Sequence, residues 1–172
     1  MSVGRALRAP TPLDPERAWD YALELLARRA MSAAEVRDRL RRRSLPEDDA
    51  EAVVAKLERL GLLNDRAFAE AYVRSRARER GRLALRRELQ HKGVAEDVAD
   101  GALAPHDDAD QALAARALLT KHAWRFAAAA DDARAVQAAR ARAYGLLARR
   151  GFPPDAVAAA IAEVLGDGED GP

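Results

Sequence analysis

Residues 89–94 read Leu-Gln-His-Lys-Gly-Val, and the same spacing of two apolar residues around a basic residue and a small one occurs twice more. Residues 40–45 read Leu-Arg-Arg-Arg-Ser-Leu, and residues 147–152 read Leu-Ala-Arg-Arg-Gly-Phe. A small residue before the second apolar position suits the left-handed conformation that commonly ends a helix. A basic residue beside it suits the negative end of the helix dipole. The three stretches therefore predict one helical unit that is repeated three times.

Capping residues and helically spaced apolar residues extend each turn into a unit of three helices. Residues 14–15 (Asp-Pro) and 32–35 (Ser-Ala-Ala-Glu) have the patterns of helix starts, and the second is a capping box. Residues 64–65 (Asn-Asp) precede a helix that we expect to run to Arg80, and residues 106–108 (His-Asp-Asp) precede the third unit's first helix.

We therefore expect an all-α protein of three tandem three-helix repeats that resemble helix-turn-helix units. Each repeat is too small to bury much apolar surface alone, so neighbouring repeats should stack into an elongated, curved array. The expected boundaries are a flexible N-terminal arm at 1–13, repeats at 14–62, 63–105 and 106–166, and an acidic tail at 167–172.

The composition supports the all-α expectation and excludes several classes of protein. The chain has 172 residues, of which 42 are alanine, the best helix former. It has no cysteine, which excludes disulfides and thiolate metal sites. We find no apolar run that could span a membrane and no secretory signal, and we expect a soluble, cytoplasmic monomer.

The sequence contains no motif for an enzymatic site, and we expect neither catalysis nor a cofactor. Glycine-rich phosphate loops, metalloprotease motifs and nucleophile elbows are all absent. His106 and the nearby aspartates 107, 108 and 110 could be imagined as a metal site, but a linker that caps the next helix explains them better.

Basic residues are concentrated in the middle of the chain, although the net charge is only +1. The window 74–92 holds eight basic residues against Glu79 and Glu88. The second helix of each repeat is basic, whereas the third helix is acidic. Because phosphate would repel an acidic recognition helix, sequence-specific DNA reading through these turns is not expected.

Most aromatic residues fall on apolar stripes, so core packing explains them better than base stacking does. We assign Phe68, Tyr72, Leu85 and Leu89 to the core of the second repeat. Trp124 and Tyr144 belong to the same group of stripe aromatics.

The chain resembles the RecX family of bacterial recombinase regulators. The matching block runs from Gly61-Leu62-Leu63-Asn64-Asp65 through Phe68, Tyr72 and Arg76 to Gly81 and Glu88–Val94. Supporting matches lie at 21–29 and 146–152, and the resemblance covers about residues 16–165. Two departures are Ser44, where the family often has glycine, and the alanine-rich stretch 112–143, which matches poorly.

The resemblance implies a non-catalytic modulator in the regulation of recombination, DNA repair and the SOS response. Its partners would be the RecA recombinase and the RecA–DNA filament, in whose groove it would lodge to inhibit recombinase and ATPase activity. We predict that basic residues form the contact surface for RecA or DNA. They are Arg41, Arg42, Arg43, Arg74, Arg76, Arg78, Arg80, Arg82, Arg86, Arg87, Lys92, Arg149 and Arg150. Reversing the charges of Arg82, Arg86 and Arg87 together should abolish inhibition without loss of helicity.

Two other functions stay open. The chain could be a nucleic-acid-binding regulator that contacts single- or double-stranded DNA directly and has no recombinase partner. It could also be a purely structural helical-repeat adaptor, which would bind neither DNA nor RecA. Steeply salt-dependent DNA binding without an effect on RecA would favour the first.

Overall fold

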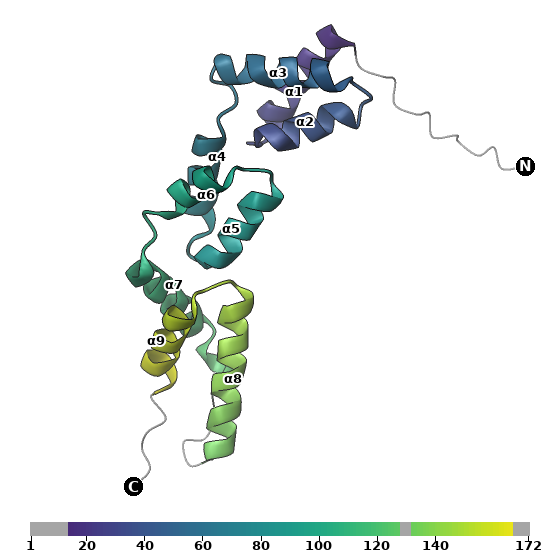
Figure 1. Cartoon of the computed structure of the whole chain (residues 1–172). Helices are drawn as coiled ribbons and strands as arrows, with labels where there is room; N and C mark the ends of the chain where they lie inside the picture. The colour runs from purple at the N-terminus through teal and green to yellow at the C-terminus, as the bar shows by residue number, and fades with distance from the viewer. Residues whose placement is uncertain (1–13, 128–131, 167–172) are drawn as a thin grey trace, which may run out of the picture. The chain divides into compact units, whose positions relative to one another are not determined.

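A computed structural model describes residues 14–127 and 132–166, and helices account for nearly all of its regular structure (Figure 1). The described residues form nine α-helices and one short 3₁₀ helix, with no strand among them. The helices are α1 (Pro15–Arg28), α2 (Ala33–Arg41), α3 (Glu47–Arg59), α4 (Asp65–Arg76), α5 (Arg82–His91), α6 (Glu96–Leu103), α7 (Asp108–Lys121), η1 (Ala123–Arg125), α8 (Ala133–Arg149) and α9 (Pro154–Leu165). The predicted all-α class is confirmed, whereas the predicted arm at 1–13 and tail at 167–172 lie outside the described residues.

The chain divides into two compact units, the first ending at Phe68 and the second beginning at Ala69. The division falls inside α4, so it does not follow the predicted repeat boundaries. The repeat boundaries and the curvature of the array stay predictions. Within the described ranges, every helix falls short of the length and apolar content that a membrane crossing requires.

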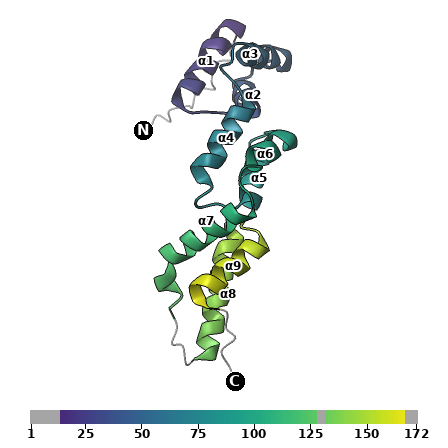
Figure 2. The same ribbon diagram turned by 90° about the vertical axis from the view of Figure 1, so that its left-hand side faces the viewer.

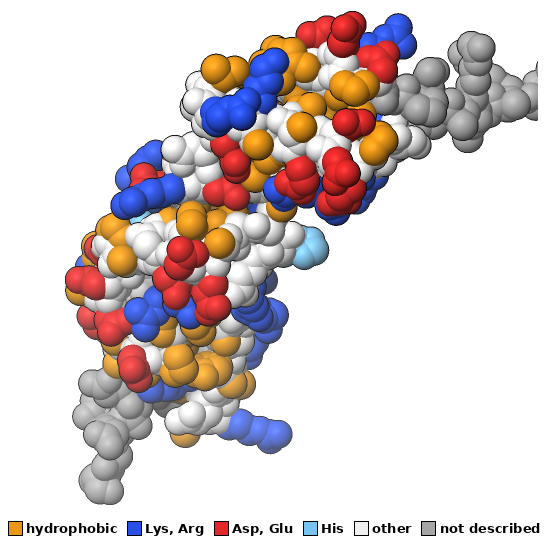
Figure 3. All heavy atoms as spheres, turned by 45° about the horizontal axis from the view of Figure 1, so that its top comes forward, with side chains coloured by type: hydrophobic (Ala, Val, Ile, Leu, Met, Phe, Trp, Pro, Cys, Tyr) orange, Lys and Arg blue, Asp and Glu red, His pale blue; other side chains and the backbone are white. Residues whose placement is uncertain are grey.

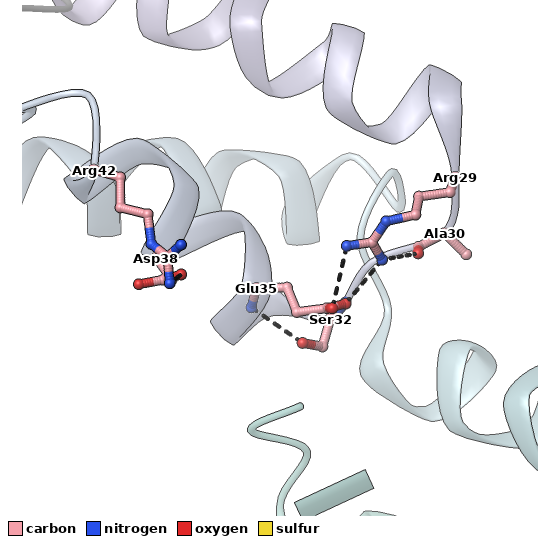
Figure 4. Close-up of polar contacts among 6 residues, drawn as sticks. All are labelled: Arg29, Ala30, Ser32, Glu35, Asp38 and Arg42. Atoms are coloured by element: carbon pink, nitrogen blue, oxygen red, sulfur yellow. Dashed lines mark hydrogen bonds and ion pairs between the residues drawn. The ribbon is translucent and has the colours of Figure 1, made fainter. Parts of the chain in front are cut away.

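The first unit is held together by caps and by a small apolar core. Ser32 begins α2 with a capping box, in which its hydroxyl accepts from the Glu35 amide at 3.1 Å (Figure 4). The Arg29 guanidinium donates to both carboxylate oxygens of Glu35 at 3.2 Å. The Ala33 amide donates to the Asp65 carboxylate at 2.7 Å, which ties the start of α2 to the start of α4. The core of this unit includes Val36, Leu40, Val54 and Leu57.

The three repeated turns all adopt the helix-ending conformation that their spacing predicts. Ser44, Gly93 and Gly151 have φ values of 59°, 72° and 79°. In each turn the amide of the second apolar residue donates to the carbonyl of the first, as from Val94 to Leu89 at 3.1 Å. This is the hydrogen bond of a Schellman motif, which brings the two apolar side chains together beneath the turn. The fixed spacing of apolar residues therefore corresponds to the same turn conformation in all three places.

In the second unit, α7 lies beside α9, as Figures 1 and 2 both show, and α8 packs against α9. Leu119, Leu147 and Val157 are buried between these helices. Leu85 and Leu89 of α5 are fully buried, as the sequence predicts. The cores consist of leucine, valine and alanine, in keeping with the low aromatic content.

The start of α5 is capped by the third repeat instead of by a side chain of its own. Its N-cap residue is Gly81, which has no side chain to accept a hydrogen bond. The Arg82 amide donates to the Gln111 side-chain oxygen at 2.8 Å, and the Leu83 amide donates to the Gly151 carbonyl at 3.1 Å. The Gly81 amide donates to the Arg150 carbonyl at 2.9 Å. Amides that a helix start leaves unpaired therefore join the second and third repeats.

The α4 helix is shorter than the sequence predicts, and this prediction was wrong. It ends at Arg76, and the chain turns through residues 77–80 instead of continuing helically to Arg80. The Glu79 carbonyl accepts from the Arg150 side chain at 3.1 Å, and the Gly81 amide is taken by the Arg150 carbonyl. The Ala77 and Arg80 amides still donate to the Val73 and Arg76 carbonyls at 2.8 and 2.9 Å, so a hydrogen-bonded turn leads from α4 to these contacts with the third repeat.

Candidate functional site

A basic hollow opens where α4, α5 and the end of α8 meet in the second unit. Its volume is about 400 Å³. We call it the Tyr72 hollow. Its lining residues are Tyr72, Arg80, Ala84, Arg87, Glu88, His91, Lys92 and Arg149. It therefore gathers four of the predicted contact residues, three from the second repeat and one from the third.

A hydrogen-bonded network organises one wall of the Tyr72 hollow. The Tyr72 hydroxyl donates to one Glu88 oxygen at 2.8 Å, and the Arg80 Nε lies 3.4 Å from the other. Burial, followed by the hydrogen bond to Glu88, raises the pKa of Tyr72. The sequence assigns Tyr72 wholly to the core, but the structure leaves it half-buried on this wall.

Cations surround the Tyr72 ring. The Arg76 guanidinium carbon lies 4.2 Å from the ring centroid, and the Lys92 Nζ lies 5.4 Å from it. Both distances are within the range of a cation–π contact. The ring therefore lies beside two charges that are sixteen residues apart in the sequence, one in the last turn of α4 and the other at the C-cap of α5.

Arg87 and Arg149 supply the positive charge of the Tyr72 hollow that is not matched internally. Arg87 Nε donates to the Leu83 carbonyl of its own helix at 3.1 Å, which fixes the side chain without neutralising it. Neither arginine has a carboxylate partner among the described residues. Glu88 is the only acidic lining residue within that part of the chain. The hollow is thus suited to a phosphate or carboxylate group.

Arg74 and Arg78 lie on a different hollow, between the end of α4 and α7. This hollow has a volume of about 410 Å³ and an apolar wall from α7 that includes Leu113. The Leu113 side chain is 54% exposed. Asp110 is on the same lining, so this hollow carries less net positive charge than the Tyr72 hollow.

Two further arginines of the predicted surface in the second repeat, Arg82 and Arg86, are paired with carboxylates of the protein. The Arg82 guanidinium lies 2.9 Å from an Asp108 oxygen, and that of Arg86 lies 2.6 Å from an Asp100 oxygen. On the face in Figure 3, red and blue side chains interleave instead of forming one continuous basic surface. The positions of the Arg82 and Arg86 side chains are thus set by ion pairs within the protein.

The predicted arginines of the first repeat lie in the first unit, where each contacts a side chain of that unit. Arg41 pairs with Glu47, and Arg42 lies 2.8 Å from Asp38 (Figure 4). The Arg43 guanidinium carbon lies 5.1 Å from the Tyr21 ring centroid. Arg150, in the second unit, donates to the Glu79 carbonyl and so serves the joint between repeats.

The structure also exposes basic and aromatic residues that sequence reasoning missed. Arg125 and Arg142 join Arg149 around a further hollow of about 470 Å³, which we call the Arg142 hollow. Next to it in the chain, Trp124 is 77% exposed, and Tyr144 of α8 is 48% exposed. The prediction that stripe aromatics pack in the core is wrong for these two. The alanine-rich context hid them, because alanine marks no clear apolar face.

Family models match the first two repeats. The model of the first three-helix domain of RecX matches residues 18–57, and that of the second three-helix domain matches residues 64–103. The matched ranges contain the whole of α2, α4, α5 and α6, most of α1 and α3, and the first two repeated turns.

Whole-chain comparisons give the same family. A "Regulatory protein RecX" from Amycolatopsis mediterranei is 36% identical over 162 residues, which cover 91% of this chain and 90% of the relative. One from Chlorobium phaeobacteroides is 31% identical and covers 88% of this chain and 96% of the relative. The crystal structure of RecX from Lactobacillus salivarius superposes with a TM-score of 0.76, at 26% identity, over 87% of this chain and 96% of that one.

Proposed function

This chain belongs to the RecX family of regulatory proteins, and from that premise we propose that it binds the RecA recombinase and its nucleoprotein filament. Bound there, it inhibits recombinase and ATPase activity by lodging in the filament groove. The observation that carries the proposal is the similarity to regulatory RecX proteins over nine-tenths of both chains. No catalytic step is required of it, because the protein acts by occupying a surface.

The Tyr72 hollow is the contact site that the charges favour. Arg87 and Arg149 reach it from two repeats, and both are exposed. An anionic group of the filament, either a carboxylate or a DNA phosphate, would gain bidentate hydrogen bonds from these guanidinium groups. Arg80 contributes less, because Glu88 already balances it.

The first test is RecA strand exchange and ATP hydrolysis with the purified protein added below the RecA concentration. We expect inhibition by the unaltered chain and roughly tenfold weaker inhibition by Arg87→Glu with Arg149→Glu, because like charges would then meet at the interface. A control pair, Arg39→Glu with Arg59→Glu, makes the same change of net charge in the first unit at exposed positions. No inhibition by the unaltered chain would reject the proposed function, and equal effects of the two pairs would reject the Tyr72 hollow as the contact.

The triple reversal of Arg82, Arg86 and Arg87 is a weaker test than the sequence suggests. Reversing the first two would place new carboxylates beside Asp108 and Asp100. The resulting loss of stability could abolish inhibition whether or not these arginines touch RecA. Replacing them with glutamine, and checking the unfolding curve, separates the two effects.

A DNA-binding regulator without a recombinase partner is the second candidate. It is favoured by the arginines around the Arg142 hollow that have no carboxylate partner in the described part of the chain. Tight, salt-dependent DNA binding together with unaltered RecA activities would support this function instead.

A further inference from the structure

We propose that Trp124 and the Arg142 hollow form a binding site for single-stranded nucleic acid, in which a base stacks on the exposed indole and arginines hold the adjoining phosphates. The proposal deepens the proposed function and rests on it for the setting in which the protein meets single strands. The binding itself requires no recombinase.

The exposure of Trp124 is the first observation. The side chain is 77% exposed, on the short helix Ala123–Arg125, and the Arg125 guanidinium carbon lies 6.0 Å from its ring centroid. An exposed indole offers a large, flat apolar face on which another ring can stack. Aromatic faces in protein sites for single strands stack with bases of any sequence.

The charge of the neighbouring hollow is the second observation. Arg125, Arg142 and Arg149 line it together with apolar groups of Phe126, Ala141 and Leu146. None of these arginines has an ion-pair partner within residues 14–127 and 132–166, and no carboxylate from those ranges lines the hollow. Three guanidinium groups without a carboxylate partner in those ranges line about 470 Å³ of space, so the hollow is suited to a ligand with several negative charges.

Gly145 is the third observation, because the Arg149 guanidinium lies beside it. It lies inside α8, where alanine would be the better helix former. A Cβ added there would lie 3.0 Å from Arg149 Nη1, tighter than an ordinary contact. Nη1 is the far end of a flexible side chain and can shift by a few tenths of an ångström, so the observation used here is the position itself: the Arg149 guanidinium lies against α8 beside Gly145, on the wall of the hollow.

A single strand fits these observations better than a duplex or an acidic protein does. Bases in a duplex are already stacked on one another, so they cannot also cover an indole at the surface. An acidic protein segment would satisfy the arginines but would give no reason for the exposed ring beside them. The pairing of a flat aromatic face with phosphate-binding groups is the chemistry of single-strand recognition.

The test uses the full chain carrying Trp19→Phe, because Trp19 and Trp124 are its only tryptophans. We titrate it with oligothymidylate of about 15 nucleotides and follow tryptophan emission. Stacking predicts quenching on binding, whereas a duplex of equal length should bind more weakly and quench less. As a reporter control, Trp124→Phe leaves only Trp19, whose emission should not respond.

Affinities of the variants are measured by the anisotropy of a labelled oligonucleotide. We expect Trp124→Ala to weaken binding by about 5- to 100-fold, the range of one lost stacking contact. Arg142→Gln should weaken binding and lower the slope of log affinity against log salt by about 0.7, the share of one phosphate contact on a single strand. Arg59→Gln removes one charge from the first unit and should change the affinity little.

Several outcomes would overturn the proposal. One is unchanged affinity in a folded Trp124→Ala chain. Another is binding and quenching by the duplex that equal those by the single strand. A third is that polyglutamate displaces the labelled oligonucleotide as effectively as unlabelled oligonucleotide does, which would indicate an acidic protein partner. Because no RecA is present, these failures would leave the proposed function standing. Conversely, if the unaltered chain failed to inhibit RecA, the proposed nucleic-acid site would not be contradicted.

Discussion

Replacing Gly81 with alanine should separate the second and third repeats where their backbones touch. A Cβ at this position would lie 2.2 Å from the Gly151 carbonyl oxygen and 2.3 Å from the Phe152 nitrogen. Both are backbone atoms, so no flexible side chain can move aside. The Gly81 backbone itself is extended, with φ at −75°, which alanine adopts freely. The whole effect therefore comes from the close approach.

The magnitude follows from two contributions. Overpacking of this kind costs about 1–3 kcal/mol. Relief of the overlap would also lengthen the hydrogen bonds from Gly81 to Arg150 and from Leu83 to Gly151, each worth about 0.5–1.5 kcal/mol. We expect Gly81→Ala to lower the free energy of unfolding of the second unit by about 2–6 kcal/mol, with the upper end reached if both hydrogen bonds are lost.

The assay is urea unfolding of chains that also carry Trp124→Phe, followed by far-ultraviolet circular dichroism and by the fluorescence of Trp19, which is then the remaining tryptophan and reports the first unit. The second unit should unfold at lower urea, whereas the Trp19 transition should not move. Hydrogen exchange at the amides of Gly81 and Leu83 should become faster. A matched control is Gly101→Ala in α6, where a Cβ meets nothing within 4 Å and the helix should gain about 0.5–1 kcal/mol. The reasoning is refuted if Gly81→Ala is as stable as the unaltered chain and keeps both amides protected.

Three further substitutions test single contacts. Gln111→Leu leaves the Arg82 amide without its acceptor and should destabilise the second unit by about 1–3 kcal/mol in the same urea assay. Tyr72→Phe should reduce the loss of stability above pH 10.0. The pKa of Tyr72 is raised in the folded protein, so its neutral hydroxyl stabilises the fold at lower pH, and this stabilisation is lost as the pH rises through that raised pKa. An equal loss of stability above pH 10.0 in both chains would contradict this. Glu51→Gln should reduce the loss of stability below pH 4.5, because the hydrogen bond from Arg37 lowers the pKa of Glu51 and its contribution is lost as pH falls through that value; the Trp19 transition measures it.

Local patterns predicted the helices and their turns well, because the signals lie within a few residues of what they specify. The Ser32 capping box and the left-handed turns at Ser44, Gly93 and Gly151 are set by hydrogen bonds inside one turn of chain. Such bonds form wherever the right residues stand at the right spacing. The fold class followed from them directly.

Contacts between repeats were beyond sequence reasoning. Nothing in residues 64–81 indicates that the turn after α4 meets a carbonyl and a side chain of Arg150. The division of arginines into paired and unpaired ones has the same origin. Arg82 meets Asp108 only because the second and third repeats pack together.

The turn between α8 and α9 links the joint to both proposed contact sites. Arg150 and Gly151 hold the start of α5 through their backbone carbonyls. The preceding residue, Arg149, lines the Tyr72 hollow and the Arg142 hollow at once. Because a helix start fixes the turn by hydrogen bonds, the position of the Arg149 guanidinium depends on the backbone contact at Gly81. The two hollows therefore share a cation whose placement is set by packing between repeats, and a ligand in one would compete with a ligand in the other for it.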